Sequence, residues 1–145
     1  MGRLHLVSAE LDRELDAIRQ TLATFHAVAG IEDVITVLQR AEHTELVDLI
    51  GHSSSGFLVL GSWTINDSPQ TAASFSQLVR PLLEARGVRT IRLLGCSTAA
   101  TERGRCALRR IARATRCDVL GTRRYITRRD YVATGFARED SLVRA

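Results

Sequence analysis

The sequence predicts an α/β fold, a three-layer α/β/α sandwich with a mostly parallel sheet. Apolar runs of strand length, such as Leu46–Ile50 and Val88–Leu94, alternate along the chain with stretches of helical periodicity. The 145 residues, 45% of them hydrophobic, suffice for one buried core and are too few for two ordinary domains. We therefore expect a single domain over residues 1–138, followed by a polar, loosely held tail over residues 139–145.

The N-terminal third predicts one strand and two helices. Residues Arg3–Val7 form a short apolar run typical of a strand, and Ser8 is expected to cap the helix that follows. Residues 31–41 again show helical spacing; their β-branched cluster leaves a strand open, but we favour a helix. The first helix should end by Gly30 and bury a single stripe, namely Leu11, Leu15, Ile18, Leu22 and Phe25.

The middle of the chain predicts a hairpin and then a loop. The buried strand Leu46–Ile50 leads into a serine-rich turn, and Phe57–Leu60 should return beside it as the second strand of the hairpin. Residues 63–67 are then expected to form a loop.

A helix should begin at Ser68, because serine is a good N-cap and Pro69 is tolerated at the first helical position. Pro81 lacks a backbone N–H group and should kink or split this helix. Gly87 is expected to end it, just before the strand Val88–Leu94.

The last third predicts an amphipathic helix followed by two strands. The strands are expected at residues 117–120 and 131–136, with a turn at residues 121–125 between them. The helix should bury Ala107, Leu108, Ile111 and Ala114 and present a solvated basic face, formed by Arg105, Arg109, Arg113 and Arg116.

All 20 basic residues are arginine, and they are unevenly distributed. Residues 1–79 hold four Arg against ten acidic residues, whereas residues 80–145 hold sixteen Arg against six. A basic half of this kind is one feature of nucleic-acid-binding proteins, but it lacks the interleaved aromatic residues on which bases stack. Nucleic-acid binding is therefore an alternative that the sequence does not favour.

Cysteine usage and hydropathy argue against disulfide-rich, zinc-binding, secreted and membrane-spanning proteins. The three scattered cysteines do not form a disulfide framework, and no Cys/His spacing suggests zinc. The N-terminus turns acidic where a secretory signal would be apolar, and no run approaches the length of a membrane span. We expect a soluble, cytoplasmic protein with reduced thiols, without a metal, a cofactor or a membrane partner.

Residues 51–56, Gly-His-Ser-Ser-Ser-Gly, are similar to the nucleophile elbow of serine hydrolases. An elbow serine needs a histidine downstream, and none of the four histidines follows Ser53. The elbow also leads into a helix, whereas Phe57–Leu60 predicts a strand. His52, rather than Ser53, is therefore the candidate functional residue of this stretch.

His52 and Cys96 each follow a buried strand, at the edge of the sheet where loops collect functional side chains. A histidine and a cysteine are the parts of a thiol nucleophile and its general base. His52 precedes Cys96 by 44 residues, close to the roughly 50 residues that separate the two in caspases. The alternative is that Cys96 is a small packing residue at a strand end.

Three stretches of the chain resemble the caspase-like cysteine peptidases, a group that includes caspases, gingipains, separases and bacterial CHAT-type domains. They are LVDLIGHSSSGFLVLG, IRLLGCSTA and CDVLGTRRYITRRDYVATGF, which fall in this order between residues 46 and 136. The resemblance implies a caspase-like fold in which neighbouring strands deliver the catalytic His52 and the nucleophile Cys96. It also implies oxyanion donors, the backbone N–H groups of Ser53 and Cys96, although the family has glycine where Ser53 stands.

The function implied by this resemblance is that of a bacterial-type cysteine endopeptidase, which cleaves a protein or peptide through a thioester acyl-enzyme. The helix expected just after Cys96 would favour the thiolate through its N-terminal dipole. The Cys96 turn holds no acidic residue to bind a basic substrate side chain, and the nearby arginines would favour an acidic one. A catalytically silent caspase-like interaction or signalling module, with a regulatory protein as partner, is the alternative.

The other candidate residues have structural interpretations. Cys106 and Cys117 are expected to be packing residues, and Asp48 inside an apolar strand needs an ion-pair partner. Asp67 and Asp130 are expected in loops that could border a substrate pocket. The remaining histidines, expected to be structural or exposed, are His5, His26 and His43.

Overall fold

The computed structural model describes residues 2–54 and 56–145, which fold around a six-stranded sheet. The strand order is β11-β8-β7-β3-β1-β2, in which all neighbours are parallel except the antiparallel edge strand β11. The strands are β1 (Arg3–Ser8), β2 (His26–Val28), β3 (Leu46–Ile50), β7 (Thr90–Leu94), β8 (Asp118–Thr122) and β11 (Leu142–Arg144). The predicted α/β fold with a mostly parallel sheet is confirmed.

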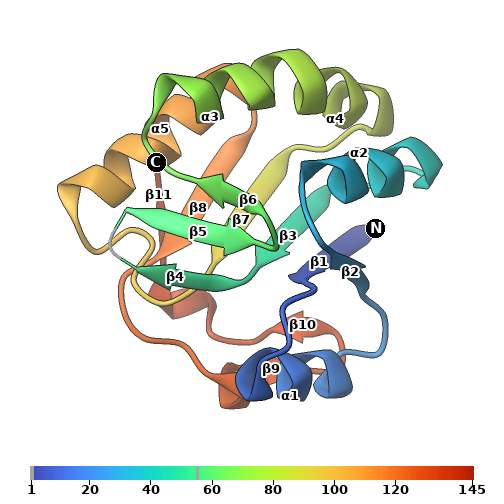
Figure 1. Cartoon of the computed structure of the whole chain (residues 1–145), viewed down its shortest axis with the longest axis vertical. Coiled ribbons are helices and arrows are strands. Elements are labelled where there is room, and N and C mark those ends of the chain that lie inside the picture. Colours follow the sequence, from blue (N-terminus) through green and yellow to red (C-terminus); the bar gives the residue numbers. More distant parts are fainter. Residues whose placement is uncertain (1, 55) are drawn as a thin grey trace.

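One face of this sheet is covered by four helices (Figure 1). They are α2 (Ile31–Arg40), α3 (Pro69–Ser74), α4 (Arg80–Arg86) and α5 (Glu102–Thr115). Alternate residues of the strands point into this layer, as the pleat requires, and the main core forms there. Leu6, Leu49 and Leu93 of three adjacent strands lie in the same cluster as Phe75 and Leu108 of the helical layer.

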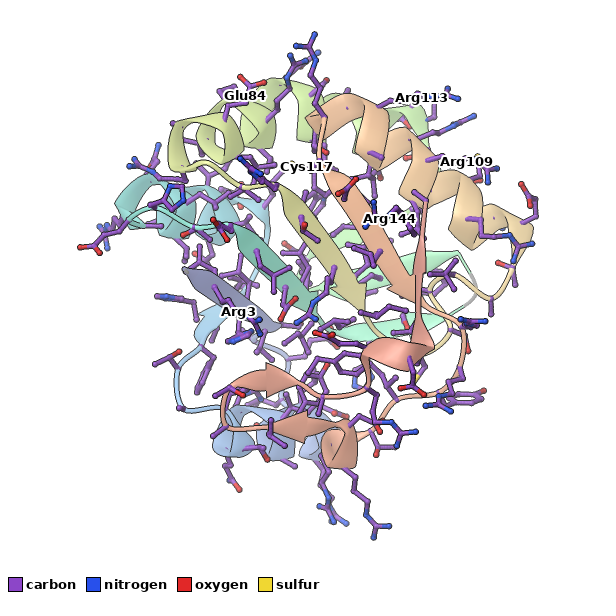
Figure 2. The ribbon with its side chains drawn as sticks, turned by 180° about the vertical axis from the view of Figure 1, so that it is seen from behind. Arg3, Glu84, Arg109, Arg113, Cys117 and Arg144 are labelled. Carbon is purple, nitrogen blue, oxygen red and sulfur yellow. The ribbon has the colours of Figure 1, made fainter. Side chains whose placement is uncertain are left out.

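The opposite face is covered only at the carboxyl ends of the strands. Helix α1 (Arg13–Thr21) and a hairpin of β9 (Tyr131–Val132) and β10 (Gly135–Phe136) lie there and form a second, smaller core. That core includes Val7, Ile50 and Leu94, which come from three adjacent strands. Figure 2 shows this side of the sheet, with the amino-terminal halves of the strands in open view.

A buried ionic row crosses the sheet on this second face. His5 of β1, Asp48 of β3 and Arg92 of β7 are register partners on adjacent strands. Arg92 donates from Nε and Nη2 to the two carboxylate oxygens of Asp48, at 2.6 and 2.8 Å, and His5 Nδ1 lies 2.9 Å from Asp48 Oδ2. All three side chains are buried, so the ion-pair partner expected for Asp48 is Arg92, supported by His5.

The hairpin predicted for the middle of the chain is wrong in its pairing. Both edges of β3 are already occupied by β1 and β7, so Phe57–Leu60 (β5) cannot return beside it. It pairs instead with an extension of the chain, β4 (His52–Ser54), and with β6 (Trp63–Ile65), which lies where a loop was expected. The serine-rich turn between β4 and β5 contains residue 55, which lies outside the described residues.

The start of α1 also differs from the prediction. Ser8 is not an N-cap, because it belongs to β1 and its buried hydroxyl accepts a hydrogen bond from the Gly61 amide. Asp12 caps α1 instead, accepting from the Leu15 amide. Helical spacing wrongly included Leu11, which is 98% exposed, and Phe25, which is 38% exposed and lies next to the unpredicted strand β2.

The helix expected from residue 68 to 87 is confirmed together with its interruption. Ser68 accepts a hydrogen bond from the Thr71 amide, and Pro69 occupies the first turn. A π-helical segment, Phe75–Val79, separates α3 from α4 just before Pro81, where the missing N–H group breaks the ladder. Gly87 ends α4 with φ at 79°, a conformation that glycine adopts without strain.

Two predictions for the C-terminal region are wrong. The final strand expected at residues 131–136 is the β9–β10 hairpin, because Gly135 has φ at 136° and the chain turns back on itself. The expected loose tail at residues 139–145 contains a 3-10 turn, Glu139–Ser141, and the edge strand β11. Strand β11 satisfies the backbone groups of β8, which would otherwise form an open sheet edge.

Candidate functional site

His52 and Cys96 lie at the same edge of the sheet. Strands β3 and β7 are parallel neighbours with Ile50 opposite Leu94, and the Gly51 amide donates to the Leu94 carbonyl at 3.3 Å. His52 follows Ile50 by two residues and Cys96 follows Leu94 by two, so both leave the sheet at the carboxyl ends of adjacent strands. The structure therefore brings together the two residues that the sequence singled out.

Both residues line one small cavity of about 60 Å³. Twelve residues form its wall, contributed by α1, the ends of β3 and β7, β4, β9 and the loop that carries Ile126. The backbone of Gly51 and Gly95 and the side chain of Ser53 complete the rim next to the histidine and the cysteine.

A third group at this site was missed by the sequence analysis. Asp12 Oδ1 lies 3.0 Å from His52 Nε2, and the imidazole is half exposed. The same carboxylate caps α1, with Oδ2 accepting from the Leu15 amide at 2.9 Å. The Leu15 amide and then the His52 side chain hold the pKa of Asp12 below its ordinary value of 3.8. Asp12 is therefore a carboxylate at neutral pH.

This contact sets which nitrogen of His52 can act as a base. A carboxylate only accepts hydrogen bonds, so the placement of Asp12 beside Nε2 favours the tautomer that carries its proton on Nε2. In neutral imidazole the other nitrogen, Nδ1, is then unprotonated. The site thus contains a histidine with a carboxylate beside one ring nitrogen, the arrangement that orients general bases in enzymes.

Cys96 sits in a tight turn rather than at the start of a helix. Its half-buried Sγ donates to the Ile126 carbonyl at 3.3 Å. Helix α5 begins only at Glu102, capped by Thr101, so the expected effect of a helix dipole on the thiol is wrong. The next residue, Ser97, has φ at 58°, and its amide donates to the Arg124 carbonyl at 3.0 Å. Such left-handed backbone in a residue other than glycine is frequent at functional sites.

Ser53 connects the two strand ends. Its hydroxyl donates to the Cys96 carbonyl at 2.6 Å, and its side chain packs against the Cα of Gly95. A serine here, where the resemblance implies glycine, therefore fixes the turn that presents the thiol. In the described residues, the Cys96 amide has no backbone or side-chain acceptor, so it is free to donate to a ligand.

The packing of Ser53 on Gly95 makes a testable prediction. A Cβ added at Gly95 would lie 2.6 Å from Ser53 Cβ and 2.8 Å from Leu58 Cδ1, so Gly95→Ala should destabilise the fold by about 1–3 kcal/mol. Ser53→Gly in the same chain should relieve part of this loss. Urea unfolding of the two single variants and the double variant measures the coupling, and strictly additive losses would contradict the contact.

The other candidates lie away from this cavity. Cys117 is buried, and burial raises the pKa of its thiol, as expected for a packing residue. Cys106 lies half-buried on α5. Asp67 contacts Arg103 and Asp130 caps a turn at Thr127, so both have structural partners. His5 is buried against Asp48, while the exposed histidines are His26 and His43.

The acidic residues of the arginine-rich half of the chain are all engaged in ion pairs with arginines, which offset part of its positive charge. Each of its six acidic residues lies within 4.0 Å of an arginine: Glu84, Glu102, Asp118, Asp130, Glu139 and Asp140. Glu102, for example, pairs with both Arg105 and Arg109 on the expected basic face of α5. These pairs reduce the positive charge that a nucleic acid would meet there.

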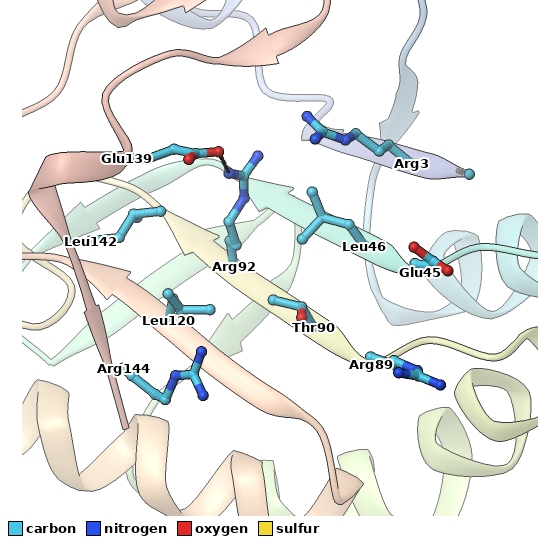
Figure 3. A pocket seen from close by; sticks show the side chains of 11 residues that line it. Arg3, Glu45, Leu46, Arg89, Thr90, Arg92, Leu120, Glu139, Leu142 and Arg144 are labelled. Atoms are coloured by element: carbon cyan, nitrogen blue, oxygen red, sulfur yellow. Dashed lines mark ion pairs between the residues drawn. The ribbon is translucent and has the colours of Figure 1, made fainter.

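A second, larger hollow of about 460 Å³ lies on the open face of the sheet, at the amino-terminal ends of the strands (Figure 3). Four arginines line it, together with Glu45 and Glu139 and the apolar side chains of Leu46, Leu120 and Leu142. They are Arg3, Arg89, Arg92 and Arg144. It contains no cysteine or histidine, and His52 and Cys96 are at the other ends of the same strands, so it is distinct from the candidate site.

Neither a metal-ligand cluster nor a membrane-spanning helix is found in the described residues. No three His, Cys, Asp or Glu side chains within residues 2–54 and 56–145 gather where they could hold a metal ion. In the same ranges, no helix is both long and apolar enough to cross a membrane.

The fold and site together define an α/β domain that presents a histidine and a cysteine at adjacent strand ends, with an aspartate behind the histidine. The chain belongs to the DUF4347 family, described as a domain of unknown function, whose family model matches residues 4–128. This match includes Asp12, His52, Ser53 and Cys96. None of the curated proteins matches the chain.

Proposed function

We propose that this protein is a caspase-like cysteine endopeptidase in which Cys96 is the nucleophile and His52 the general base. The observation that carries the proposal is that both residues line one cavity at the ends of neighbouring parallel strands. Asp12 adds support, because its carboxylate lies beside Nε2 and favours the tautomer that leaves Nδ1 free to act as the base. The resemblance of residues 46–136 to caspase-like peptidases calls for the same placement on neighbouring strands.

The proposed reaction begins when His52 Nδ1 takes the proton of the Cys96 thiol and Sγ attacks the scissile carbonyl carbon. The C–N bond of the peptide then breaks, and His52 gives the proton to the leaving amine. A water molecule, deprotonated by His52, attacks the resulting thioester, and the C–S bond breaks to release the acid and restore the thiol. Asp12 stabilises the imidazolium that forms in each step.

The backbone N–H groups of Ser53 and Cys96 are the proposed oxyanion donors. Donors aimed at the developing charge are often the largest single contribution to such a reaction. The Ser53 side chain supports this role by holding the Cys96 carbonyl, which fixes the orientation of the turn. Ser53, which replaces the glycine of the resembled family, thus makes the Cys96 turn more rigid.

Thiol labelling tests the proposed dyad. Cys96 should react with iodoacetamide at about pH 6 tenfold or more faster than Cys106, because a base-activated thiol is thiolate-rich at that pH. The advantage should disappear in His52→Ala. Cys106, half-buried on α5, and Cys117, whose thiol is buried, are internal controls in the same chain. Equal labelling of Cys96 and Cys106 in the native protein, followed by mass spectrometry, would refute an activated thiol.

Cleavage itself is tested with a peptide library. The native protein should release fragments that the matched Cys96→Ala variant does not release, and intact far-ultraviolet circular dichroism would show that the variant is folded. Labelling of Cys96 without any cleavage would favour the second candidate function instead.

That second candidate is a caspase-like interaction or signalling module without turnover. The arginine-lined hollow on the open sheet face favours it, since two of its arginines, Arg3 and Arg89, form no ion pair within the described residues and suit an acidic segment of a regulatory protein partner. Affinity for such a partner should fall in the double variant Arg3→Glu, Arg89→Glu and remain unchanged in Cys96→Ala. Unchanged affinity of the partner for the double variant would contradict the assignment of this face.

A further inference from the structure

The cavity beside His52 and Cys96 is small, and much of its wall is aliphatic. Five aliphatic side chains form much of its wall: Leu15, Ile18, Ile50, Leu94 and Ile126. No arginine lines it, whereas Glu14 does, so an acidic side chain would meet a like charge, contrary to the expectation from the nearby arginines. At about 60 Å³ it holds roughly four water-sized atoms, which is too little for a long basic side chain.

One polar group in this wall has no partner. Tyr131 lines the cavity from β9 and is buried, and its hydroxyl is the one buried side-chain polar atom of the described residues without a hydrogen bond. Its ring is fixed by an edge-on contact with Phe136, with centroids 5.4 Å apart. Buried polar atoms in native proteins nearly always have a partner, so an orphan hydroxyl at a candidate site needs an explanation.

The hydroxyl of Tyr131 is a donor throughout the physiological range. Burial first, and the nearby Asp48 second, raise the pKa of Tyr131 well above its ordinary value of 10.0. A protonated phenol in an aliphatic wall can bind a neutral acceptor such as a hydroxyl oxygen. Filling the cavity with such a group would satisfy the orphan donor and bury apolar surface at the same time.

We infer that this cavity is the subsite for the substrate side chain next to the attacked carbonyl, and that it selects a short, uncharged side chain with one acceptor atom, threonine before its isostere valine. The inference rests on the proposed peptidase function. It assigns specificity to Tyr131, because the two side chains have nearly the same shape and differ in the hydroxyl that the Tyr131 hydroxyl would contact. Glu14 in the wall accounts for the exclusion of acidic residues, and the small volume accounts for the exclusion of long basic ones.

The test uses four peptide acyloxymethyl ketones that are identical except for the residue beside the reactive carbonyl: threonine, valine, aspartate or arginine. Labelling of Cys96 is followed by mass spectrometry. Threonine should react about 3- to 10-fold faster than valine, the worth of one neutral hydrogen bond, and both should exceed aspartate and arginine. In Tyr131→Phe, which removes only the orphan hydroxyl, the threonine probe should slow to the rate of the valine probe.

The matched control is Tyr125→Phe, since Tyr125 is the other tyrosine of the chain, is 80% exposed and does not line the cavity. It should keep the threonine preference. If no probe labels Cys96 in a manner that depends on His52, the peptidase proposal itself fails. If labelling depends on His52 but threonine and valine react equally, or aspartate or arginine reacts fastest, the inference about the subsite fails and the peptidase proposal stands. The four probe rates are compared on the native protein, so the test of the subsite does not require Tyr131→Phe to fold.

Discussion

Asp12→Asn should reduce peptidase turnover by about 10²-fold or more while leaving the fold intact. Asparagine is as good an N-cap as aspartate, so α1 should keep its start at Arg13. The carboxamide can present its N–H₂ group to His52 Nε2, which removes the preference for the tautomer with a free Nδ1. The measurement is kcat for a peptide found in the library screen, together with the ¹⁵N resonances of His52.

The nitrogen resonances separate positioning of His52 from a structural role. In the native protein they should show the Nε2–H tautomer, and in Asp12→Asn a mixture. Asp16→Asn is the matched control, because Asp16 lies on the same helix and does not contact His52, and it should change neither readout. Full turnover in Asp12→Asn with an unchanged tautomer would remove Asp12 from the proposed mechanism.

Asp48→Ala should destabilise the protein by about 3–5 kcal/mol, the range for removing one partner of a buried ion pair. The variant leaves Arg92 buried without the two charge-assisted hydrogen bonds that it makes in the native protein, and it leaves His5 without its acceptor. Urea unfolding measures the loss. Asp118→Ala is the matched control, since Asp118 pairs with Arg144 at the surface and should change the free energy of unfolding by less than about 1 kcal/mol.

The same carboxylate predicts how stability depends on pH. Burial alone would raise the pKa of Asp48, but the hydrogen bonds from Arg92 and His5 outweigh it and hold the pKa below the ordinary 3.8. Because the unfolded chain then binds the proton more readily, this contribution is complete at pH values well above 3.8 and is lost as the pH falls below it. Asp48→Ala should therefore have a flatter stability profile below about pH 4 than the native protein. Parallel profiles would contradict the assignment.

Local patterns in the sequence predicted most of the secondary structure. The helical spacing at Ile31–Arg40 and the Ser68–Pro69 start are confirmed, as are the strands at Leu46–Ile50 and Thr90–Leu94. Each of these is encoded by which residues repeat on one face, or by a cap residue whose side chain bonds the next turn. The failures at Ser8 and Leu11 arise where the chain leaves the sheet before α1 begins, and the failure at Phe25 arises where the chain returns to the sheet at β2 after α1.

Some residues of the candidate site could likewise be predicted from the sequence, and others could not. His52 and Cys96 could be predicted, because each follows a recognisable buried strand and the ends of neighbouring parallel strands meet at one edge of a sheet. Asp12 was not predicted even as a helix cap, a role assigned to Ser8, and nothing in its surroundings indicated a contact with His52, 40 residues away. Tyr131 was expected in a plain strand, and only the packing of the β9–β10 hairpin against α1 and the ends of the sheet strands brings it to the cavity.

The sequence by itself determined the alternation of strands and helices, the interruption before Pro81 and the positions of the histidine and the cysteine at strand ends. The tertiary structure alone decided that β5 leaves the main sheet, that residues 142–144 close its edge, and that Asp12 and Tyr131 join the site. The physical reason is the separation along the chain over which each kind of interaction acts. Periodicity and capping act within a few residues, whereas strand edges and apolar faces find partners wherever the folded chain can satisfy their hydrogen bonds and bury their surface.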